Sequence, residues 1–151
     1  MGNIMKKTDL AYMAGIFDGE GSIGAYKPRC NLTKGTYSLG VTIISTDEWL
    51  CHMFRMAFGG SINCRQRRGK QLPVWEWKVQ SHRAAEMLKI LLPYLHLKRS
   101  QAELAIKFQS VKGNRSRRYP NKLTDEERAL EQAQAIMLKA MKKQKSGVNY
   151  G

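Results

Sequence analysis

Apolar and polar residues along this chain fall into blocks whose spacing alternates between that of helices and that of strands. Apolar side chains recur at helical spacing over residues 10–20, which predicts a helix capped by Thr8 or Asp9. Segments 22–30 and 36–44 alternate in the manner of strands on either side of a short turn-forming segment. The first part of the chain therefore predicts a helix followed by a β-hairpin.

A second helix and a second hairpin follow. The polar residues 45–48 begin a helix whose apolar face ends at the glycine pair 59–60. Strand-like alternation over 61–67 and 72–80 predicts the second hairpin, with its tryptophans on one face and its charged residues on the other.

Three further helices complete the pattern. The first begins at a Ser81 cap and runs to about residue 92, the second covers about 98–111, and the third covers about 124–143. A basic loop, 112–122, lies between the last two. A chain of 151 residues has room for one compact domain, so all of these elements are expected to share one core.

The order of the elements predicts an α/β fold of the α+β class. Its αββαββα core covers about residues 8–112, and the C-terminal helices follow this core. In such a fold the four strands form one antiparallel sheet, with helices on one face and the other face bare. The bare face is the natural surface for a partner.

The charge of the chain indicates what that partner is. The chain has 26 Lys and Arg residues against 12 Asp and Glu residues, a formal net charge of +14 at pH 7. Such a charge attracts polyanions, so nucleic acid is the expected partner, although a basic composition can also serve solubility alone. A membrane is not expected, because no run of about 18 apolar residues occurs, and nothing in the pattern indicates a small-molecule substrate.

Three widely spaced cysteines, Cys30, Cys51 and Cys64, form no C-x-x-C pattern. This spacing favours reduced, buried thiols over a disulfide framework or a zinc site. The first residues lack the apolar stretch of a signal peptide. We therefore expect an intracellular protein, and an organelle (chloroplast or mitochondrion) or a prokaryotic or phage source both stay open.

The first predicted helix has a stripe of small residues. Ala11, Gly15 and Gly19 recur every four positions, and each glycine inside a helix costs about 1 kcal/mol relative to alanine. Close packing against a second copy of the helix would offset that cost and bring two copies of Glu20 together. Two adjacent carboxylates repel unless a cation lies between them, and oxygen ligands of this kind suit Mg²⁺. The alternative is tight packing within the chain, or a helix cap, with no metal.

The nine residues Met13–Gly21, MAGIFDGEG, resemble the signature motif of the LAGLIDADG homing endonucleases. The strand pattern, the helix start at Thr46–Asp47, the segment Phe58–Gly60 and residues 92–102 are also similar to single-motif members of that family, over about residues 8–112. The resemblance implies a site-specific endonuclease encoded within an intron. Its saddle-shaped sheet would lie on double-stranded DNA, and it would hydrolyse both strands across the minor groove.

The resemblance also implies roles for individual residues. Glu20 matches the family's catalytic, metal-binding acid, and the backbone carbonyl of Gly19 is a further metal ligand. Lys98 matches a lysine near the scissile phosphate, and Asp18 matches a more structural acid. Ser45 stands where relatives have a larger polar side chain that positions water. The implied cofactor is Mg²⁺, roughly two or three ions per dimer active site, with Mn²⁺ or Ca²⁺ able to replace it for binding.

Only one such motif occurs in the chain. One chain therefore supplies half of a catalytic centre, and a homodimer with a roughly palindromic target is expected. The predicted dimer interface lies on the first helix and consists of Ala11, Tyr12, Ala14, Gly15, Asp18 and Gly19.

DNA contacts are predicted on the bare face of the sheet, because a β-ribbon fits the major groove and alternate side chains point to base edges. Arg65 and Arg67 are the expected guanine contacts. Basic residues of the turns and of the basic loop would add phosphate contacts, which give affinity rather than sequence discrimination. The predicted contact residues are Ser22, Gly24, Tyr26, Lys27, Arg29, Lys34, Ser38, Gly40, Thr42, Asn63, Arg65, Arg67, Arg68, Lys70, Val74, Glu76, Lys78, Arg115, Arg117 and Arg118.

Two other classes of function stay open at the level of the sequence. A catalytically silent DNA- or RNA-binding protein of the same fold, such as a maturase or a transcriptional regulator, would share the basic sheet, although Glu20 and Lys98 favour an enzyme. A plain RNA-binding α/β domain would share the charge, but the strands lack an aromatic-rich stacking motif. Metal-dependent cutting of a DNA target distinguishes the endonuclease from both.

Overall fold

The protein contains the predicted elements in the predicted order. The computed structural model describes residues 5–27, 37–69, 71–115 and 124–144. In chain order the elements are α1 (Lys7–Glu20), β1 (Gly21–Tyr26), β2 (Ser38–Ser45), α2 (Glu48–Phe58), β3 (Ser61–Arg65), β4 (Val74–Gln80), α3 (Ser81–Leu91), the 3-10 helix η2 (Leu92–Tyr94), α4 (Arg99–Arg115) and α5 (Asp125–Gln144). None of the helices in these described ranges combines the length and apolar character needed to cross a membrane.

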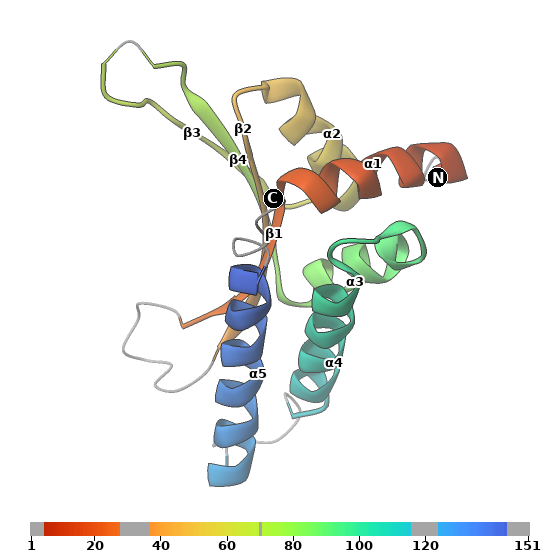
Figure 1. Ribbon diagram of the computed structural model, residues 1–151, viewed down its shortest axis with the longest axis vertical. Helices are drawn as coiled ribbons and strands as arrows, with labels where there is room; N and C mark the ends of the chain where they lie inside the picture. The colour runs from red at the N-terminus through yellow and green to blue at the C-terminus, as the bar shows by residue number, and fades with distance from the viewer. Residues whose placement is uncertain (1–4, 28–36, 70, 116–123, 145–151) are drawn as a thin grey trace, which may run out of the picture.

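One sheet of four antiparallel strands, in the order β1-β2-β4-β3, forms the centre of the protein and confirms the predicted fold class. Helices α1 to α4 lie on one side of the sheet (Figure 1). Alternate strand residues point to that side, where they meet the inner faces of the helices. The fully buried core residues include Phe17, Ile23, Val41, Ile43, Phe54, Trp77 and Leu88.

Trp77 accounts for the glycine pair at the end of α2. Its indole N–H donates a hydrogen bond of 2.8 Å to the carbonyl oxygen of Gly59, which satisfies the one polar group of this buried side chain. Gly60 has a φ of 92°, and a Cβ at this position would overlap the backbone carbonyl of Lys78. Glycine alone allows the chain to pass so close to β4, and β3 begins at the next residue.

Two predicted helix starts are wrong. α1 begins at Lys7, with Lys6 as its N-cap and no side-chain cap bond. Thr8 and Asp9 therefore lie within the first turn, where a carboxylate interacts favourably with the helix dipole. Ser81 is the first residue of α3 rather than its cap, and it has a φ of 52°. The reason is that β4 passes directly into α3, which leaves no separate capping residue between them.

The strands of the second hairpin are shorter than predicted, and the predicted end of the first strand, residues 28–30, lies outside the described residues. β1 ends at Tyr26, β3 ends at Arg65, and β4 begins at Val74, directly after Pro73. Proline has no N–H group to donate to a strand ladder, which accounts for the start of β4. Because Arg65 and Val74 form the last pair of the β3–β4 ladder, Arg67 lies beyond the strand.

α4 extends to Arg115 and therefore includes the first residues of the predicted basic loop. The ammonium group of Lys112 contacts the backbone carbonyl of Tyr37 and lies 3.2 Å from the carboxylate of Glu131, which is fully buried on α5. These contacts hold the end of α4 against β2 and α5, and so stabilise a helix where a loop was predicted.

α5 runs beside the edge strand β1 and against α4 (Figure 1). It begins one residue after its predicted start, where Thr124 and Glu127 form a reciprocal capping box: each side chain accepts a hydrogen bond from the backbone N–H of the other residue. Ala135 and Leu138 are buried on its inner face. The helix thus covers an edge of the sheet that would otherwise be open.

The two described cysteines differ in their surroundings. Cys51 is buried in the core, and burial raises the pKa of its thiol, which disfavours the reactive thiolate. Cys64 is exposed, because the edge strand β3 is open over most of its length. The prediction of buried thiols is therefore right for Cys51 and wrong for Cys64, while Cys30 lies outside the described residues.

Candidate nucleic-acid interface and catalytic centre

The strand residues predicted to contact DNA lie together on the face of the sheet that points away from α1 to α4, which we call the outer face. The pairing register shows this, because residues paired across antiparallel strands point to the same face. Ser22 pairs with Thr42, Thr42 also pairs with Lys78, and Asn63 pairs with Glu76. The other predicted pairs on the outer face are Gly24–Gly40, Tyr26–Ser38 and Arg65–Val74.

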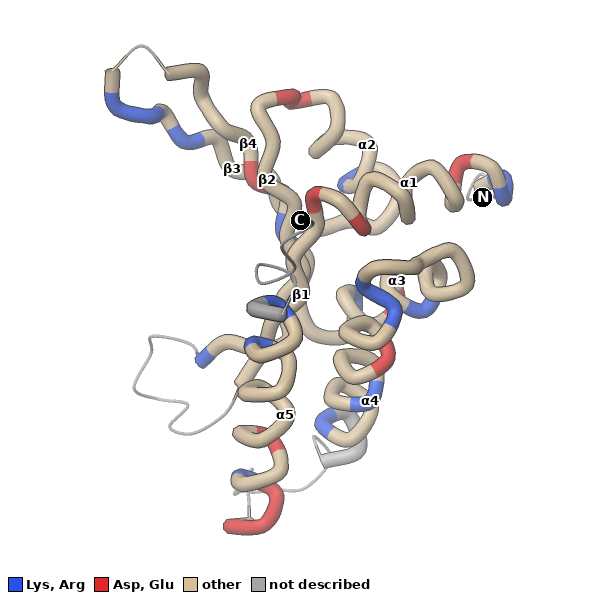
Figure 2. The backbone as a smooth tube through the Cα atoms, viewed as in Figure 1, with Lys and Arg blue, Asp and Glu red and all other residues tan. Residues whose placement is uncertain are grey.

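Basic residues gather at one end of the sheet, on the β3–β4 hairpin (Figure 2). Arg65 forms an ion pair with Glu76 on the neighbouring strand, so its guanidinium is already engaged by a carboxylate. Arg67 and Arg68 follow β3 and are exposed. Within the described ranges no ion pair engages Arg67, which makes it the better placed of the two predicted guanine contacts.

Gly24 and Gly40 do not present a surface to DNA, contrary to the prediction. Both are buried, and the ring of Tyr26 lies over them. A Cβ at Gly24 would lie 2.5 Å from the Tyr26 hydroxyl oxygen, and one at Gly40 would lie 3.2 Å from Cε2 of the ring. Since the two glycines are paired across β1 and β2, they form a flat glycine seat for the ring. Tyr26 itself is 46% exposed.

Several predicted phosphate contacts lie outside the described residues, namely Arg29, Lys34, Lys70, Arg117 and Arg118. The backbone of Arg115 forms the end of α4. Lys27 is exposed directly after β1, with its ammonium group 5.2 Å from the ring centroid of Tyr37. The contacts of these basic residues with DNA therefore stay predictions.

The small-residue stripe of α1 faces outward. No described atom beyond the helix itself lies within 4 Å of a Cβ built at Gly15 or Gly19, and Ala11 and Tyr12 are exposed. Tight packing among the described residues therefore does not account for the two glycines. We call these four residues the open face of α1.

Ala14 and Asp18 lie on the neighbouring, buried side of the helix, so the prediction that they belong to the exposed interface needs correction. Ala14 is fully buried and Asp18 is 9% exposed. Each residue step turns an α-helix by about 100°, so residues next to the glycine stripe in sequence can point into the core. This side of α1 packs against α3 and η2.

Asp18 connects the end of α1 to the start of α4. Its carboxylate accepts hydrogen bonds from the backbone N–H groups of His96, at 2.9 Å, and Lys98, at 3.1 Å. The ammonium group of Lys98 donates in return to the backbone carbonyl oxygen of Asp18, at 2.6 Å. Because Lys98 is only 7% exposed, its charge is held at the end of α1 rather than in solvent.

Replacing Asp18 by Asn tests this connection. The amide keeps one acceptor but turns an NH₂ group toward one of the two backbone N–H groups, so a buried donor loses its partner. We expect the free energy of unfolding, measured by urea denaturation, to fall by about 1–3 kcal/mol. Asp9→Asn, in the exposed first turn of α1, is the matched control and should cost less than about 1 kcal/mol. Equal, small losses in the two variants would contradict the structural role of Asp18.

Glu20 is the last residue of α1 and is exposed. The next residue, Gly21, begins β1, and a Cβ at that position would overlap the ring of Phe17. Glycine therefore lets the chain turn directly from helix into strand over this ring. As a result, the acidic end of α1 lies beside the sheet (Figure 2).

A pocket of about 200 Å³ lies at this junction, lined by Gly21, Ser22, Lys98, Gln101 and Lys142. Of these residues, Gly21, Gln101 and Lys142 were not predicted as site residues. Lys142 shares its helical spacing with the buried residues Glu131 and Leu138, and that spacing is a sequence signal that it points toward the sheet. Gln101 is 4% exposed and follows Lys98 by less than one turn of α4.

Ser45 takes part in the turn from β2 to α2. Its hydroxyl accepts a hydrogen bond of 3.0 Å from the backbone N–H of Asp47, and the Asp47 carboxylate accepts one of 3.0 Å from the N–H of Trp49. The predicted start of α2 is thereby confirmed. The role of Ser45 in positioning water stays a prediction.

The donors available to a metal are oxygen atoms at the end of α1. Among the described residues, no three His, Cys, Asp or Glu side chains are grouped so that they could hold a metal ion. The exposed residues Glu20 and Gly19 offer a carboxylate and a backbone carbonyl. Such hard ligands suit Mg²⁺ and Ca²⁺, but one chain supplies too few of them to complete a coordination shell. They fit the cation if a second chain and the DNA add further oxygen atoms.

Comparison with solved structures identifies the fold. The chain is similar to the homing endonuclease I-CvuI in complex with the I-CreI target, with a TM-score of 0.68 and 22% identity over 89% of this chain and 82% of that chain. It is similar to the archaeal intron-encoded homing endonuclease I-Vdi141I complexed with DNA, with a TM-score of 0.72 and 13% identity over 91% and 86%. The LAGLIDADG homing endonuclease I-SmaMI bound to cleaved DNA matches with a TM-score of 0.56 and 20% identity, over 99% of this chain and 46% of its own. The chain therefore has the LAGLIDADG homing endonuclease fold.

No sequence-family model and no curated protein sequence matches the chain. At identities of 22% and below, these three structures establish the fold and not the chemistry. Complexes of I-CvuI with DNA were obtained in the presence of 2 mM Mg and of 2 mM Ca. What this chain does follows from its own residues.

Proposed function

We propose that this chain is a site-specific DNA endonuclease that works as a homodimer. It hydrolyses both strands of a long, pseudo-palindromic duplex in a reaction that requires Mg²⁺, and its gene lies within an intron. The catalytic residues are Glu20 and Lys98, and Ser45 positions water. The DNA-bound homing endonucleases that share its fold support a DNA-binding sheet of this shape.

The observation that carries the proposal is the open face of α1, which leads directly to an exposed carboxylate. Gly15 and Gly19 have open space beside them, and Glu20 follows at the end of the helix. Glycine in the middle of a helix lowers its stability by about 1 kcal/mol per residue, and nothing within the described protomer compensates for that loss. Contact with a second copy of α1 does.

A dimer through this face would bring the two copies of Glu20 close to the two-fold axis. Helices that meet at small residues pack at axial distances of about 8 Å, the lower end of the usual range. Two carboxylates and two Gly19 carbonyls would then offer oxygen ligands to a shared cation site. When bound, Mg²⁺ neutralises charge on the phosphate and lowers the pKa of a bound water.

Lys98 adds positive charge at the same place. The bond from its ammonium group to the carbonyl of Asp18 fixes it at the end of α1, and the Asp18 carboxylate fixes the backbone of the same lysine. A cation held there stabilises the negative charge that builds up on a phosphate during hydrolysis, by about 2–4 kcal/mol from analogous oxyanion donors. The outer face of the sheet meanwhile binds the duplex and determines which sequence is cut.

Cleavage of a library of randomised duplexes by the purified chain tests the proposal. We expect cleavage of one related set of roughly palindromic sequences in Mg²⁺ and none in EDTA. Ca²⁺ should support binding without comparable cleavage. Tight, sequence-specific binding with no metal-dependent cleavage would contradict the enzyme and would favour a regulator on the same fold.

Replacing Arg67 by Ala tests the base contacts. Arginine donates two hydrogen bonds to guanine, and losing them costs about 1–3 kcal/mol of discrimination at one position of each half-site. We expect a relaxed preference at one symmetric pair of positions, measured by sequencing the duplexes that each variant cleaves. Arg55→Ala, on the exposed side of α2 away from the outer face, is the control and should leave the preference unchanged. An unchanged preference in Arg67→Ala would show that Arg67 contacts only phosphate or water.

A further inference from the structure

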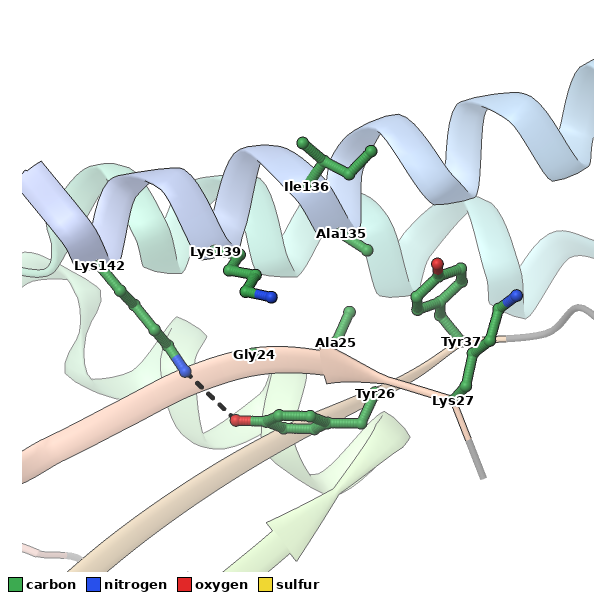
Figure 3. Close-up of a pocket in the computed structure, with 9 residues that line it drawn as sticks. All are labelled: Gly24, Ala25, Tyr26, Lys27, Tyr37, Ala135, Ile136, Lys139 and Lys142. Atoms are coloured by element: carbon green, nitrogen blue, oxygen red, sulfur yellow. Dashed lines mark hydrogen bonds between the residues drawn. The ribbon is translucent and has the colours of Figure 1, made fainter. Parts of the chain in front are cut away.

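Tyr26 and two lysines from different elements form a cluster on the outer face that the contacts above do not explain. The ammonium groups of Lys78, on β4, and Lys142, on α5, lie 6.0 Å and 5.6 Å from the centroid of the Tyr26 ring. Lys142 also donates a hydrogen bond of 3.2 Å to the Tyr26 hydroxyl, as Figure 3 shows. Three elements far apart in the sequence thus place their polar groups around one ring.

Two paired glycines support the Tyr26 ring from below. Tyr26 lies on the glycine seat, where side chains at Gly24 and Gly40 would displace the ring. The ring lies against the seat on the outer face, and Tyr26 is 46% exposed. Tyr26 also lines a pocket of about 600 Å³ between β1 and α5, in which Lys139 and Lys142 face it from the helix (Figure 3).

The position of Lys142 is fixed by the way α5 packs. Glu131 is fully buried and accepts hydrogen bonds from the N–H of Tyr37 and from Lys112, at 3.1 Å and 3.2 Å. Lys142 follows it by three helical turns and lies on the same inner stripe as the buried Leu138. The stripe therefore directs the lysine to β1 and around the edge of the sheet to its outer face.

The charge of the cluster is not neutralised within the described chain. Neither Lys78 nor Lys142 forms an ion pair there, and Glu76, two residues from Lys78 on the same face, is bonded to Arg65 instead. Two ammonium groups beside one ring repel each other unless an anion lies between them. Because the Tyr26 hydroxyl accepts from Lys142, its own proton can be donated to an acceptor above the sheet.

We propose that Tyr26, Lys78 and Lys142 form a phosphate-binding site on the outer face, and that the site binds one backbone phosphate of the duplex. The assignment rests on the proposed function, since it takes the duplex to lie on this face. The Tyr26 hydroxyl and the two ammonium groups supply donors and positive charge around one ring, and the glycine seat holds that ring in place. A phosphate fits this set better than a base, because two ammonium charges stabilise an anion most strongly.

Binding of the selected duplex to the full chain in Ca²⁺, measured over a range of KCl concentrations, tests the site. Tyr26→Phe removes the hydroxyl and keeps the ring, and we expect the Kd to rise about tenfold. Lys142→Met should weaken binding uniformly across sequences and reduce the salt slope by about 1. The two groups act on one phosphate, so their effects should not add in full. We expect the Kd of the variant with both Tyr26→Phe and Lys142→Met to exceed that of Lys142→Met by less than about threefold.

Gly24→Ala gives a sharper test, because it keeps all three polar side chains and only disturbs the seat. A methyl group 2.5 Å from the hydroxyl oxygen must displace the ring, so we expect a rise in Kd at least as large as that of Tyr26→Phe, with a thermal melt to check folding. Tyr37→Phe, which removes the hydroxyl of another tyrosine lining the same pocket, is the matched control and should leave the Kd within about twofold.

The outcomes separate this site from the proposed function. If the wild-type chain bound no specific duplex, the proposed function would fail and the site with it. If the wild type bound and both Tyr26→Phe and Gly24→Ala kept its Kd and salt slope, only the site would be overturned. A change in base preference at one position with an unchanged salt slope would also overturn it, because a base and not a phosphate would then occupy the cluster.

Discussion

Glu20→Gln is expected to abolish cleavage and to leave specific DNA binding within a few-fold of the wild type. The amide has nearly the shape of the carboxylate but no charge, so it cannot hold a divalent cation at the end of α1. Metal ions supply several kcal/mol of stabilisation in reactions of this class, and the cleavage rate should therefore fall by at least about a thousandfold. Binding survives because Glu20 lies at the end of α1 and not among the side chains of the outer face.

Single-turnover cleavage and equilibrium binding, measured on the same duplex, check both halves of this result. Glu103→Gln removes a carboxylate from the exposed side of α4 and should change neither quantity. Glu20→Asp keeps the charge on a shorter side chain and should retain part of the activity. A Glu20→Gln variant that cut at the wild-type rate would remove this residue from the mechanism.

The alternation of apolar and polar residues was enough to predict the sheet and its two faces. Trp77 and Val79 alternate with Glu76 and Lys78, and in the structure the first pair is buried while the second lies on the outer face. A period of two leaves no other arrangement once one face is covered by helices. The positions of the helices along the chain were predicted by similar reasoning, because the apolar residues on one side of a helix recur at helical spacing.

Glycines on the outer face could not be interpreted in this way. A glycine in a strand has no side chain to show which face it occupies or what lies above it. The register places Gly24 and Gly40 on the outer face as predicted, yet they are covered by Tyr26, whose own position depends on both. This three-residue arrangement has no signature in spacing or composition, so the sequence predicted a DNA contact where the structure has a seat.

The connection between Asp18 and Lys98 was equally out of reach of local patterns. The two residues are 80 positions apart, and only the folded chain brings the end of α1 to the start of α4. The resemblance indicated that both belong to one centre, but it did not reveal that the carboxylate holds the backbone of the lysine. The resemblance also did not separate Ala14 and Asp18 from the open face. Small residues lie on adjacent stripes of α1, so the sequence shows no clear boundary between its buried and its exposed side.

Gly15→Leu is expected to give a monomer with no cleavage activity. A leucine side chain on the open face would push two copies of α1 apart by more than their close packing allows, and the two copies of Glu20 would separate. Within the protomer a Cβ at this position has no described atom beyond the helix within 4 Å, and the change replaces a poor helix former by a good one. The protomer should therefore keep its fold and gain up to about 1 kcal/mol of helix stability.

Sedimentation and the concentration dependence of thermal unfolding distinguish these two effects. A wild-type dimer should unfold at a temperature that rises with protein concentration, because association stabilises the folded state, and Gly15→Leu should lose that dependence. Lys107→Leu adds the same side chain to the exposed side of α4 and should remain dimeric and active. A Gly15→Leu chain that stayed dimeric and cut DNA would place the dimer interface elsewhere, and Glu20 would then have no partner carboxylate with which to share a cation.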